Sequence, residues 1–183
     1  PRNRLQRSGC VVVTPVPMTV ISGYLGAGKT TFINRLLAAD HGKKLLILVN
    51  DFGAINIDET LLLSKDEDTI ALTNGCVCCT MGADLFLALG DALDRKPRPD
   101  HIVIEASGIS DPARIANSAL AEPDMQYAGI VTLVDGLAFA GLSDDPLIGA
   151  QIRQQISKAD LILTTKVPKG QPVSGLADIS PSK

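Results

Sequence analysis

The chain has 183 residues, of which 45% are hydrophobic and 20% are charged, and its formal net charge is −3. These values are typical of one globular domain and exclude a disordered or fibrous chain. The mildly acidic balance gives no support for nucleic acid as a partner, and no apolar run reaches the roughly 18 residues that a membrane-spanning helix needs.

Short apolar runs alternate with helical patterns along the chain, and turn-forming residues separate them. The runs that predict strands are 18–23, 44–50, 101–106, 129–135 and 159–165. The patterns that predict helices are 29–40, 83–95, 111–121 and 146–157. Asp111 is expected to cap the third helix, with Pro112 in its first turn. Continuous apolar strands that alternate with helices predict an α/β fold with a doubly wound, mostly parallel sheet.

The same pattern predicts three regions. Residues 1–17 are expected to form an N-terminal tail, residues 18–166 one α/β domain, and residues 167–183, which are rich in Pro, Gly and Ser, a linker or tail. Ligands of doubly wound sheets bind at the carboxyl ends of the strands. The residues that follow each predicted strand are therefore the candidates for chemistry.

The segment GYLGAGKT, residues 23–30, fits the pattern G-x-x-x-x-G-K-[ST] and lies between a predicted strand and a predicted helix. Its glycines let backbone N–H groups point at phosphate oxygens, and the start of the helix adds its positive end. Lys29, a candidate catalytic residue, would reach the β- and γ-phosphates, and the Thr30 hydroxyl would bind Mg²⁺. The alternative is a glycine-rich turn that only links strand to helix. The candidate nucleotide-binding residues here are Gly23, Gly26, Ala27, Gly28, Lys29, Thr30 and Thr31.

Two later segments supply further candidate catalytic groups. Glu105 ends an apolar strand, where a carboxylate can hold Mg²⁺ through a bound water or orient the attacking water. Gly108 follows, and its N–H can approach a γ-phosphate because glycine has no side chain. Asp51, in the acidic segment 50–59, is the first candidate for a nucleotide-sensing switch. For Glu105, the alternative is a carboxylate that caps the strand and only pairs with a lysine. For the segment 50–59, it is an ordinary solvated acidic loop.

Base recognition is expected after the last predicted strand. Thr165 and Lys166 fit the start of a T-K-x-D pattern, in which the Lys lies over the base and the Asp reads the N–H groups of guanine. Pro168 stands where the Asp is expected, and proline has neither a side-chain acceptor nor an N–H. Lys166 is therefore a candidate nucleotide-binding residue, but these residues do not predict guanine over adenine.

Three cysteines lie within four positions of the segment TNGCVCCT, residues 73–80. Thiolates are soft ligands that suit Zn²⁺, and Cys76, Cys78 and Cys79 can converge on one ion with one tetrahedral position open. A reactive thiol, or buried cysteines that pack as hydrophobic side chains, are the alternatives. Cysteines that are clustered rather than spread along the chain indicate a reducing, cytoplasmic setting.

Taken together, the segments GYLGAGKTT, NDFG, TNGCVCC and IEASGISDP, in this order, resemble those of the CobW-like metallochaperone P-loop GTPases, relatives of the urease and hydrogenase nickel-insertion GTPases. The resemblance implies a P-loop NTPase fold over residues 18–166. It also implies a GTP-hydrolysing protein that binds Mg²⁺ and Zn²⁺, or sometimes cobalt, and delivers the transferred metal to a client metalloprotein. It assigns the switch to Asp51, the Mg²⁺-side element to Glu105 with Gly108, and the transferred metal to the three cysteines.

Two departures from the family pattern affect these expectations. The base-reading Asp is absent, and the usual carboxy-terminal domain of the family is not found in these residues, so client recognition is expected outside them. Two other functions stay open: a P-loop small-molecule kinase, and a non-catalytic zinc-binding nucleotide switch. A homodimer also stays open.

Overall fold

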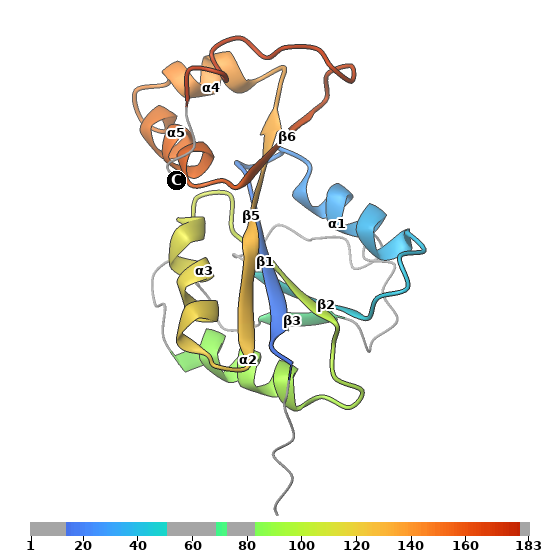
Figure 1. Ribbon diagram of the computed structural model, residues 1–183. Helices are drawn as coiled ribbons and strands as arrows, with labels where there is room; N and C mark the ends of the chain where they lie inside the picture. The colour runs from blue at the N-terminus through green and yellow to red at the C-terminus, as the bar shows by residue number, and fades with distance from the viewer. Residues whose placement is uncertain (1–13, 51–68, 73–82, 180–183) are drawn as a thin grey trace, which may run out of the picture.

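Six parallel strands form one sheet in the part of the chain that the computed structural model describes, residues 14–50, 69–72 and 83–179. The strands lie in the order β3-β2-β4-β1-β5-β6 across the sheet (Figure 1). Their bounds are β1 Val16–Ser22, β2 Leu45–Asn50, β3 Thr69–Leu72, β4 His101–Glu105, β5 Met125–Asp135 and β6 Leu161–Thr165. The helices are α1 Lys29–Ala38, α2 Ala83–Asp94, α3 Pro112–Ala121, α4 Phe139–Asp144 and α5 Gly149–Ser157.

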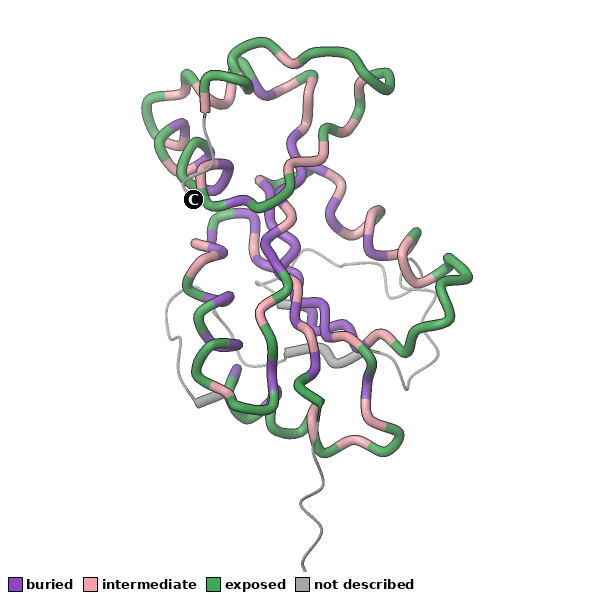
Figure 2. The backbone as a smooth tube through the Cα atoms, in the orientation of Figure 1, coloured by how far each residue is buried: buried purple, intermediate pink, exposed green. Residues whose placement is uncertain are grey.

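Helices cover both faces of the sheet, because successive side chains of a strand point to opposite faces. Ile33 of α1 packs on one face in a cluster with the strand residue Ile47. Leu89 of α2 and Ile115 of α3 pack on the other face with Leu48. Buried residues lie in the central strands and on the helix faces that pack against them (Figure 2). The predicted α/β fold with a doubly wound parallel sheet is confirmed.

A third apolar cluster lies beyond the carboxyl end of β5. It joins α4 and α5 to that strand end, and its buried members are Val134, Phe139, Ile152 and Ile156. Val173, Leu176 and Ile179 pack against it. Part of the segment expected to be a linker or tail, residues 167–183, therefore contacts the domain.

Several element boundaries differ from the predicted ones. The short elements β3 and α4 were not predicted, because four to six residues are too few to show a period. β5 starts earlier than expected, since its first residues alternate in burial and give no continuous apolar run. α5 starts later than expected because Asp145 accepts hydrogen bonds from the N–H groups of Leu147 and Ile148, which form a turn. Within the described ranges, no helix is long and apolar enough to cross a membrane.

The start of α3 is as predicted. Asp111 Oδ1 accepts a hydrogen bond of 3.0 Å from the N–H of Ala113, and Pro112 lies in the first turn. The cap satisfies a backbone N–H that has no partner inside the helix. It also fixes the end of the loop that leads from β4 into α3.

We expect Asp111→Ala to lower the free energy of unfolding by about 1 kcal/mol, because the first turn of α3 loses its cap. Urea denaturation at neutral pH measures the change. Asp111→Asn keeps a side-chain acceptor at the same place and should lower the free energy of unfolding much less. Equal losses in the two variants would contradict the role of the cap.

Candidate functional site

The phosphate loop lies between the end of β1 and the start of α1. Gly23 has a φ of +136°, and a Cβ added there would lie 2.3 Å from the carbonyl oxygen of Leu133 on β5. Only glycine fits this close approach without strain. Gly26 and Gly28 also have positive φ values. The loop therefore turns tightly over the carboxyl edge of the sheet, where Ala27 is buried and the α1 residue Thr31 is exposed.

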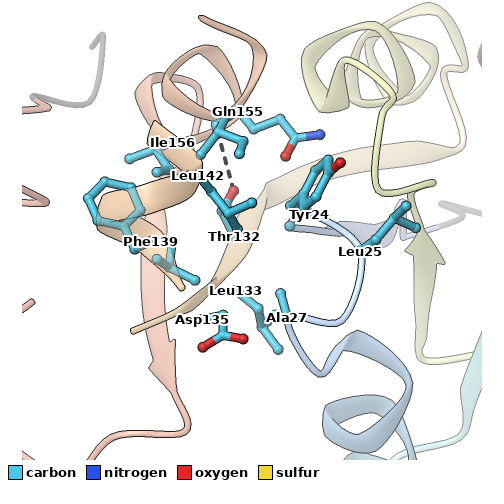
Figure 3. A pocket seen from close by; sticks show the side chains of 13 residues that line it. Tyr24, Leu25, Ala27, Thr132, Leu133, Asp135, Phe139, Leu142, Gln155 and Ile156 are labelled. Carbon is cyan, nitrogen blue, oxygen red and sulfur yellow. Dashed lines mark hydrogen bonds between the residues drawn. The ribbon is translucent and has the colours of Figure 1, made fainter. Parts of the chain in front are cut away.

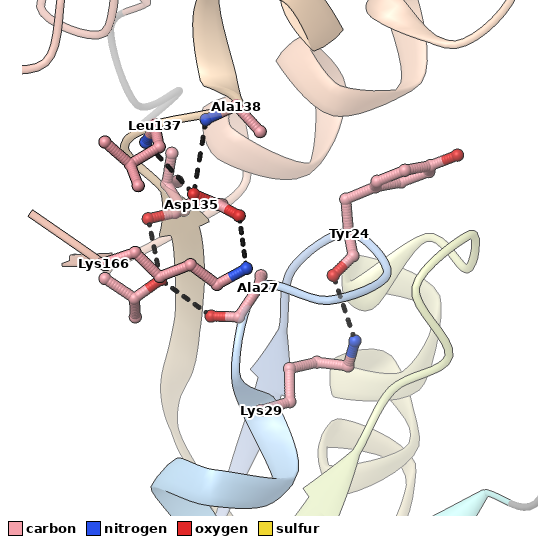
Figure 4. A network of polar contacts seen from close by, with 9 residues as sticks. Tyr24, Ala27, Lys29, Asp135, Leu137, Ala138 and Lys166 are labelled. Carbon is pink, nitrogen blue, oxygen red and sulfur yellow. Dashed lines mark hydrogen bonds and ion pairs between the residues drawn. The ribbon is translucent and has the colours of Figure 1, made fainter.

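Lys29 is the first residue of α1, and its side chain turns back into the loop. The residue is only 8% exposed, and its Nζ donates to the carbonyl oxygen of Gly23 at 2.9 Å. It also donates to that of Tyr24 at 3.4 Å (Figure 4). Burial lowers the pKa of the Lys29 ammonium, and the negative charge of Glu105 partly opposes that shift. A cation is thus held inside the loop with Glu105 as its acidic neighbour.

Glu105 is the last residue of β4, and it pairs in register with Ile21 of β1. Its Oε1 accepts a hydrogen bond of 3.3 Å from the Thr30 hydroxyl. Its Oε2 is buried and has no hydrogen-bond partner among the described residues. Burial raises the pKa of Glu105, while the charge of Lys29 and the hydrogen bond from Thr30 oppose that rise. A hydroxyl and a carboxylate with a spare oxygen are donors that suit a hard cation.

Gly108 lies in the loop that follows β4 and is buried against the phosphate loop. A Cβ added to it would lie 2.8 Å from the backbone nitrogen of Leu25 and 2.9 Å from the Leu25 side chain. This contact is too close for any residue but glycine. The loop after β4 and the phosphate loop therefore touch backbone to backbone, and the contact of Gly108 with a γ-phosphate stays a prediction.

The end of β6 is tied to the phosphate loop. The Thr165 hydroxyl donates to the carbonyl oxygen of Ala27 at 2.9 Å and approaches that of Val134 at 3.3 Å. Sequence reasoning matched Thr165 to a base-recognition pattern but did not find this link. The available signal for this link was a hydroxyl at the carboxyl end of a strand, one position before the Lys of that pattern.

Lys166 follows with a left-handed φ of 62° and places its Nζ 2.6 Å from Asp135 Oδ2 (Figure 4). The Oδ1 of Asp135 accepts the N–H groups of Leu137 and Ala138. Burial acts to raise the pKa of Asp135, but the hydrogen bonds from Lys166 and from the two N–H groups outweigh it, so the pKa is lowered. Pro168 is exposed and offers only its carbonyl, which accepts from the N–H of Gln171.

Four of the predicted site residues lie outside the described residues: Asp51, Cys76, Cys78 and Cys79. Among the residues that the structure does describe, no group of three or more His, Cys, Asp or Glu side chains could hold a metal ion. The zinc site and the acidic switch therefore stay predictions. The remaining predicted residues converge on the carboxyl edge of the sheet, around the ends of β1, β4 and β6.

A parallel sheet with this loop between its first strand and first helix defines a P-loop nucleotide-binding domain. The chain belongs to the CobW/HypB/UreG family, because the family's nucleotide-binding domain matches residues 17–176.

Individual relatives agree with this assignment. The zinc chaperone CobW of Sinorhizobium sp. is 36% identical over 180 residues, which cover 82% of this chain and 51% of that protein. The zinc-regulated GTPase metalloprotein activator 1 of Dictyostelium discoideum is 38% identical over 122 residues, 60% of this chain and 26% of that protein. The chain thus spans about half or less of the length of these two curated relatives.

A solved structure also agrees with the assignment to this family. The chain is similar to a Zn(II)-bound triple mutant of the YjiA GTPase, with a TM-score of 0.57 and 27% identity. The similarity covers 82% of this chain and 49% of that one.

We expect Asp135→Asn to remove a pH-dependent contribution to stability. The folded chain lowers the pKa of Asp135 below its usual value of 3.8, so the unfolded chain binds the proton more readily. The contribution is therefore present above pH 3.8 and is lost as the pH falls through the lowered pKa.

The difference in free energy of unfolding between wild type and Asp135→Asn should be on the order of 1 kcal/mol or less at neutral pH, because the pair is partly exposed. It should shrink in acid when measured by urea denaturation over a pH series. Asp144→Asn, at an exposed position of α4, corrects for the loss of one acidic charge from the chain. A difference that is the same at every pH would contradict the ion pair.

Proposed function

We propose that the chain binds GTP with Mg²⁺ on the phosphate loop, hydrolyses it, and transfers Zn²⁺ to a client metalloprotein in the cytoplasm. The observation that carries this proposal is the contact between Thr30 and the buried Glu105 beside the buried Lys29, in a chain of the CobW/HypB/UreG family. The names of the relatives, which include a zinc chaperone, a zinc-regulated activator and GTPases, support both the nucleotide and the metal.

The phosphate loop would hold the β- and γ-phosphates. The backbone N–H groups of residues 23–30 and the start of α1 favour an anion. Lys29 is already inside the loop, where it bonds to two carbonyl oxygens of the loop itself. A phosphate oxygen would give the buried ammonium a charged partner in place of neutral ones, and such a bond is stronger.

Mg²⁺ fits the residues at the end of β4. The Oε2 of Glu105, which has no partner among the described residues, can accept a hydrogen bond from a Mg²⁺-bound water, and the Thr30 hydroxyl donates to Oε1 of the same carboxylate. Mg²⁺ keeps several waters and prefers oxygen ligands, so this donor set suits it. When bound, the ion would neutralise charge on the phosphates. Glu105, at the end of β4, and Gly108, in the loop that follows, would then face the γ-phosphate.

Lys166 would contact the base, because the end of β6 is joined to the phosphate loop through Thr165 and Ala27. Asp135 holds the Lys166 ammonium at one side of this region. Pro168 supplies no side chain that reads guanine, so the proposed preference for GTP over ATP rests on membership of the family.

The transferred Zn²⁺ would be bound by Cys76, Cys78 and Cys79. The last residues of β2 and β3, Asn50 and Leu72, are register partners in neighbouring parallel strands. The strand ends that precede the acidic segment and the cysteine segment therefore lie side by side, at the same edge of the sheet as the phosphate loop. We propose that this proximity couples nucleotide state to zinc affinity, each ligand shifting the affinity for the other by the same factor.

We expect Lys29→Met to weaken binding of GTP roughly 10- to 100-fold, because it removes a charge-assisted hydrogen bond to phosphate. Titration with a fluorescent GTP analogue measures the affinity. Lys44→Met removes a positive charge at an exposed position next to β2 and should leave that affinity unchanged. Unaltered binding by Lys29→Met would contradict the phosphate site.

We expect the zinc affinity with a non-hydrolysable GTP analogue to differ from that with GDP by about 5-fold or more, the lower end of typical coupling between two sites. Competition with a zinc-binding dye measures both values. Cys78→Ser should abolish the zinc site, whereas Cys10→Ser, outside the cluster, should leave it intact.

Equal zinc affinities in the two nucleotide states would rule out the coupling. Nucleotide turnover that requires a small-molecule acceptor and ignores zinc would favour a kinase in place of the proposed chaperone.

A further inference from the structure

Helix α5 contacts the loop that follows β4 through two glutamine side chains. Gln151 and Gln155 are one turn apart, so they lie on the same face of the helix. Gln155 Nε2 donates to the carbonyl oxygens of Gly108 and Ser110, each at 3.0 Å. Gln151 Nε2 donates to the carbonyl oxygen of Ile109, which lies between them. Three consecutive carbonyl oxygens of the loop are therefore bound by one helix face.

Gln155 is built into the domain rather than lying on its surface. The residue is 2% exposed, although glutamine is usually found at protein surfaces. Its own carbonyl oxygen accepts a hydrogen bond from the Thr132 hydroxyl of β5 at 3.4 Å (Figure 3). The strand thus holds the backbone of Gln155, and the side chain holds the loop.

The chemistry of the contact fixes which way the amide points. The NH₂ group of Gln155 faces two carbonyl oxygens, and only N–H hydrogens can bond to them. The reversed orientation would place the amide oxygen against both acceptors. Each N–H hydrogen of the amide therefore has a partner in the loop, and no other side chain of similar length offers two donors from one neutral atom.

The position of the loop matters because Gly108 rests on the phosphate loop. A Cβ at Gly108 would lie 2.8 Å from Leu25 N, so the two backbones are in contact. Gln155 and Tyr24 of the phosphate loop also line one small cavity of about 20 Å³ (Figure 3). A space of this size holds about one water molecule. The amide therefore sits where α5, the loop after β4 and the phosphate loop meet.

We infer that Gln155 is the positioning residue for the γ-phosphate contact of Gly108, with Gln151 in support. The inference rests on the proposed function, in which Gly108 N–H faces the γ-phosphate. The two bonds from Gln155 keep the loop against the phosphate loop, so the N–H of Gly108 is in place before a triphosphate binds. A diphosphate lacks the γ-phosphate and gains nothing from this placement.

Gln155→Met tests the inference, because methionine keeps the length of the side chain and removes both donors. The affinity for a non-hydrolysable GTP analogue should fall roughly tenfold, because the loop must then be ordered when the triphosphate binds, at a cost of up to that of the two lost hydrogen bonds. The affinity for GDP should change less than twofold, roughly within the ordinary scatter of single substitutions. Gln151→Met should show a smaller loss of the same kind and serves if Gln155→Met does not fold.

Gln154→Met is the matched control, since Gln154 is the neighbouring residue of α5 and is exposed. It should leave both affinities unchanged. Amide hydrogen exchange of residues 106–111 in the nucleotide-free chain adds a second readout, and it should be faster in Gln155→Met but not in Gln154→Met.

Two results would overturn the inference alone: a Gln155→Met chain that keeps the wild-type ratio of the two affinities, or one that loses affinity for both nucleotides by the same factor. A wild-type chain that binds neither nucleotide would overturn the proposed function, and this inference with it.

Discussion

The burial of Lys29, at the start of α1, beside Glu105, at the end of β4, is the constraint on which the site depends. Each residue is 8% exposed. Burial lowers the pKa of Lys29 and raises that of Glu105, and both shifts favour the neutral form of the side chain. Taking such charges out of water is costly unless partners compensate. The partners come from the backbone of the phosphate loop and from Thr30. Among the described residues they leave one oxygen of Glu105 without a hydrogen bond, so the compensation that these residues give is incomplete. A phosphate anion and a hydrated Mg²⁺ would complete it.

The strand order explains why these two residues meet. β1 lies between β4 and β5, and Ile21 pairs with Glu105 in the parallel register. The phosphate loop leaves β1 at this point, and the chain passes to opposite sides of β1 when it forms β4 and β5. Ligands of doubly wound sheets bind where the strand order reverses in this way. The site is therefore a consequence of topology as much as of its motif.

The sequence predicted the parts of the fold that depend on local pattern. Apolar runs located five of the six described strands, and the Asp111 cap was found because capping is a local hydrogen bond. The strand Thr69–Leu72 escaped prediction because four residues carry no period. The phosphate loop was located by the spacing of its Gly, Lys and Thr residues, and Glu105 by its place at the end of an apolar strand, since both are local features of the sequence.

Contacts between residues far apart in the chain could not be found in this way. Gln155 bonds to Gly108 across 47 positions, and no local pattern encodes that distance. One signal was present: Gln155 lies on the side of α5 that carries Ile152 and Ile156, and a polar residue on a buried apolar face requires a partner. The identity of that partner depends on tertiary structure.

The third apolar cluster joins α5 to the end of β5, in addition to its contact with the loop after β4. Ile152 and Ile156 pack with Val134 near the end of β5, while Gln155 holds the loop after β4. Val134 is followed by Asp135, which binds Lys166. The helix thus contacts both the loop proposed to face the γ-phosphate and the end of β5, where Asp135 binds the Lys166 that is proposed to contact the base.

The most direct test of the central claim is the binding of Mg²⁺·GTP and Mg²⁺·ATP to the chain, measured by calorimetry with and without Zn²⁺. The phosphate and Mg²⁺ site built on Lys29 and Glu105 predicts nucleotide binding that is lost when Mg²⁺ is removed. Membership of the family predicts tighter binding of GTP than of ATP, and the proposed coupling predicts a change in affinity when Zn²⁺ is added. Tighter binding of ATP, or no binding of either nucleotide, would contradict it.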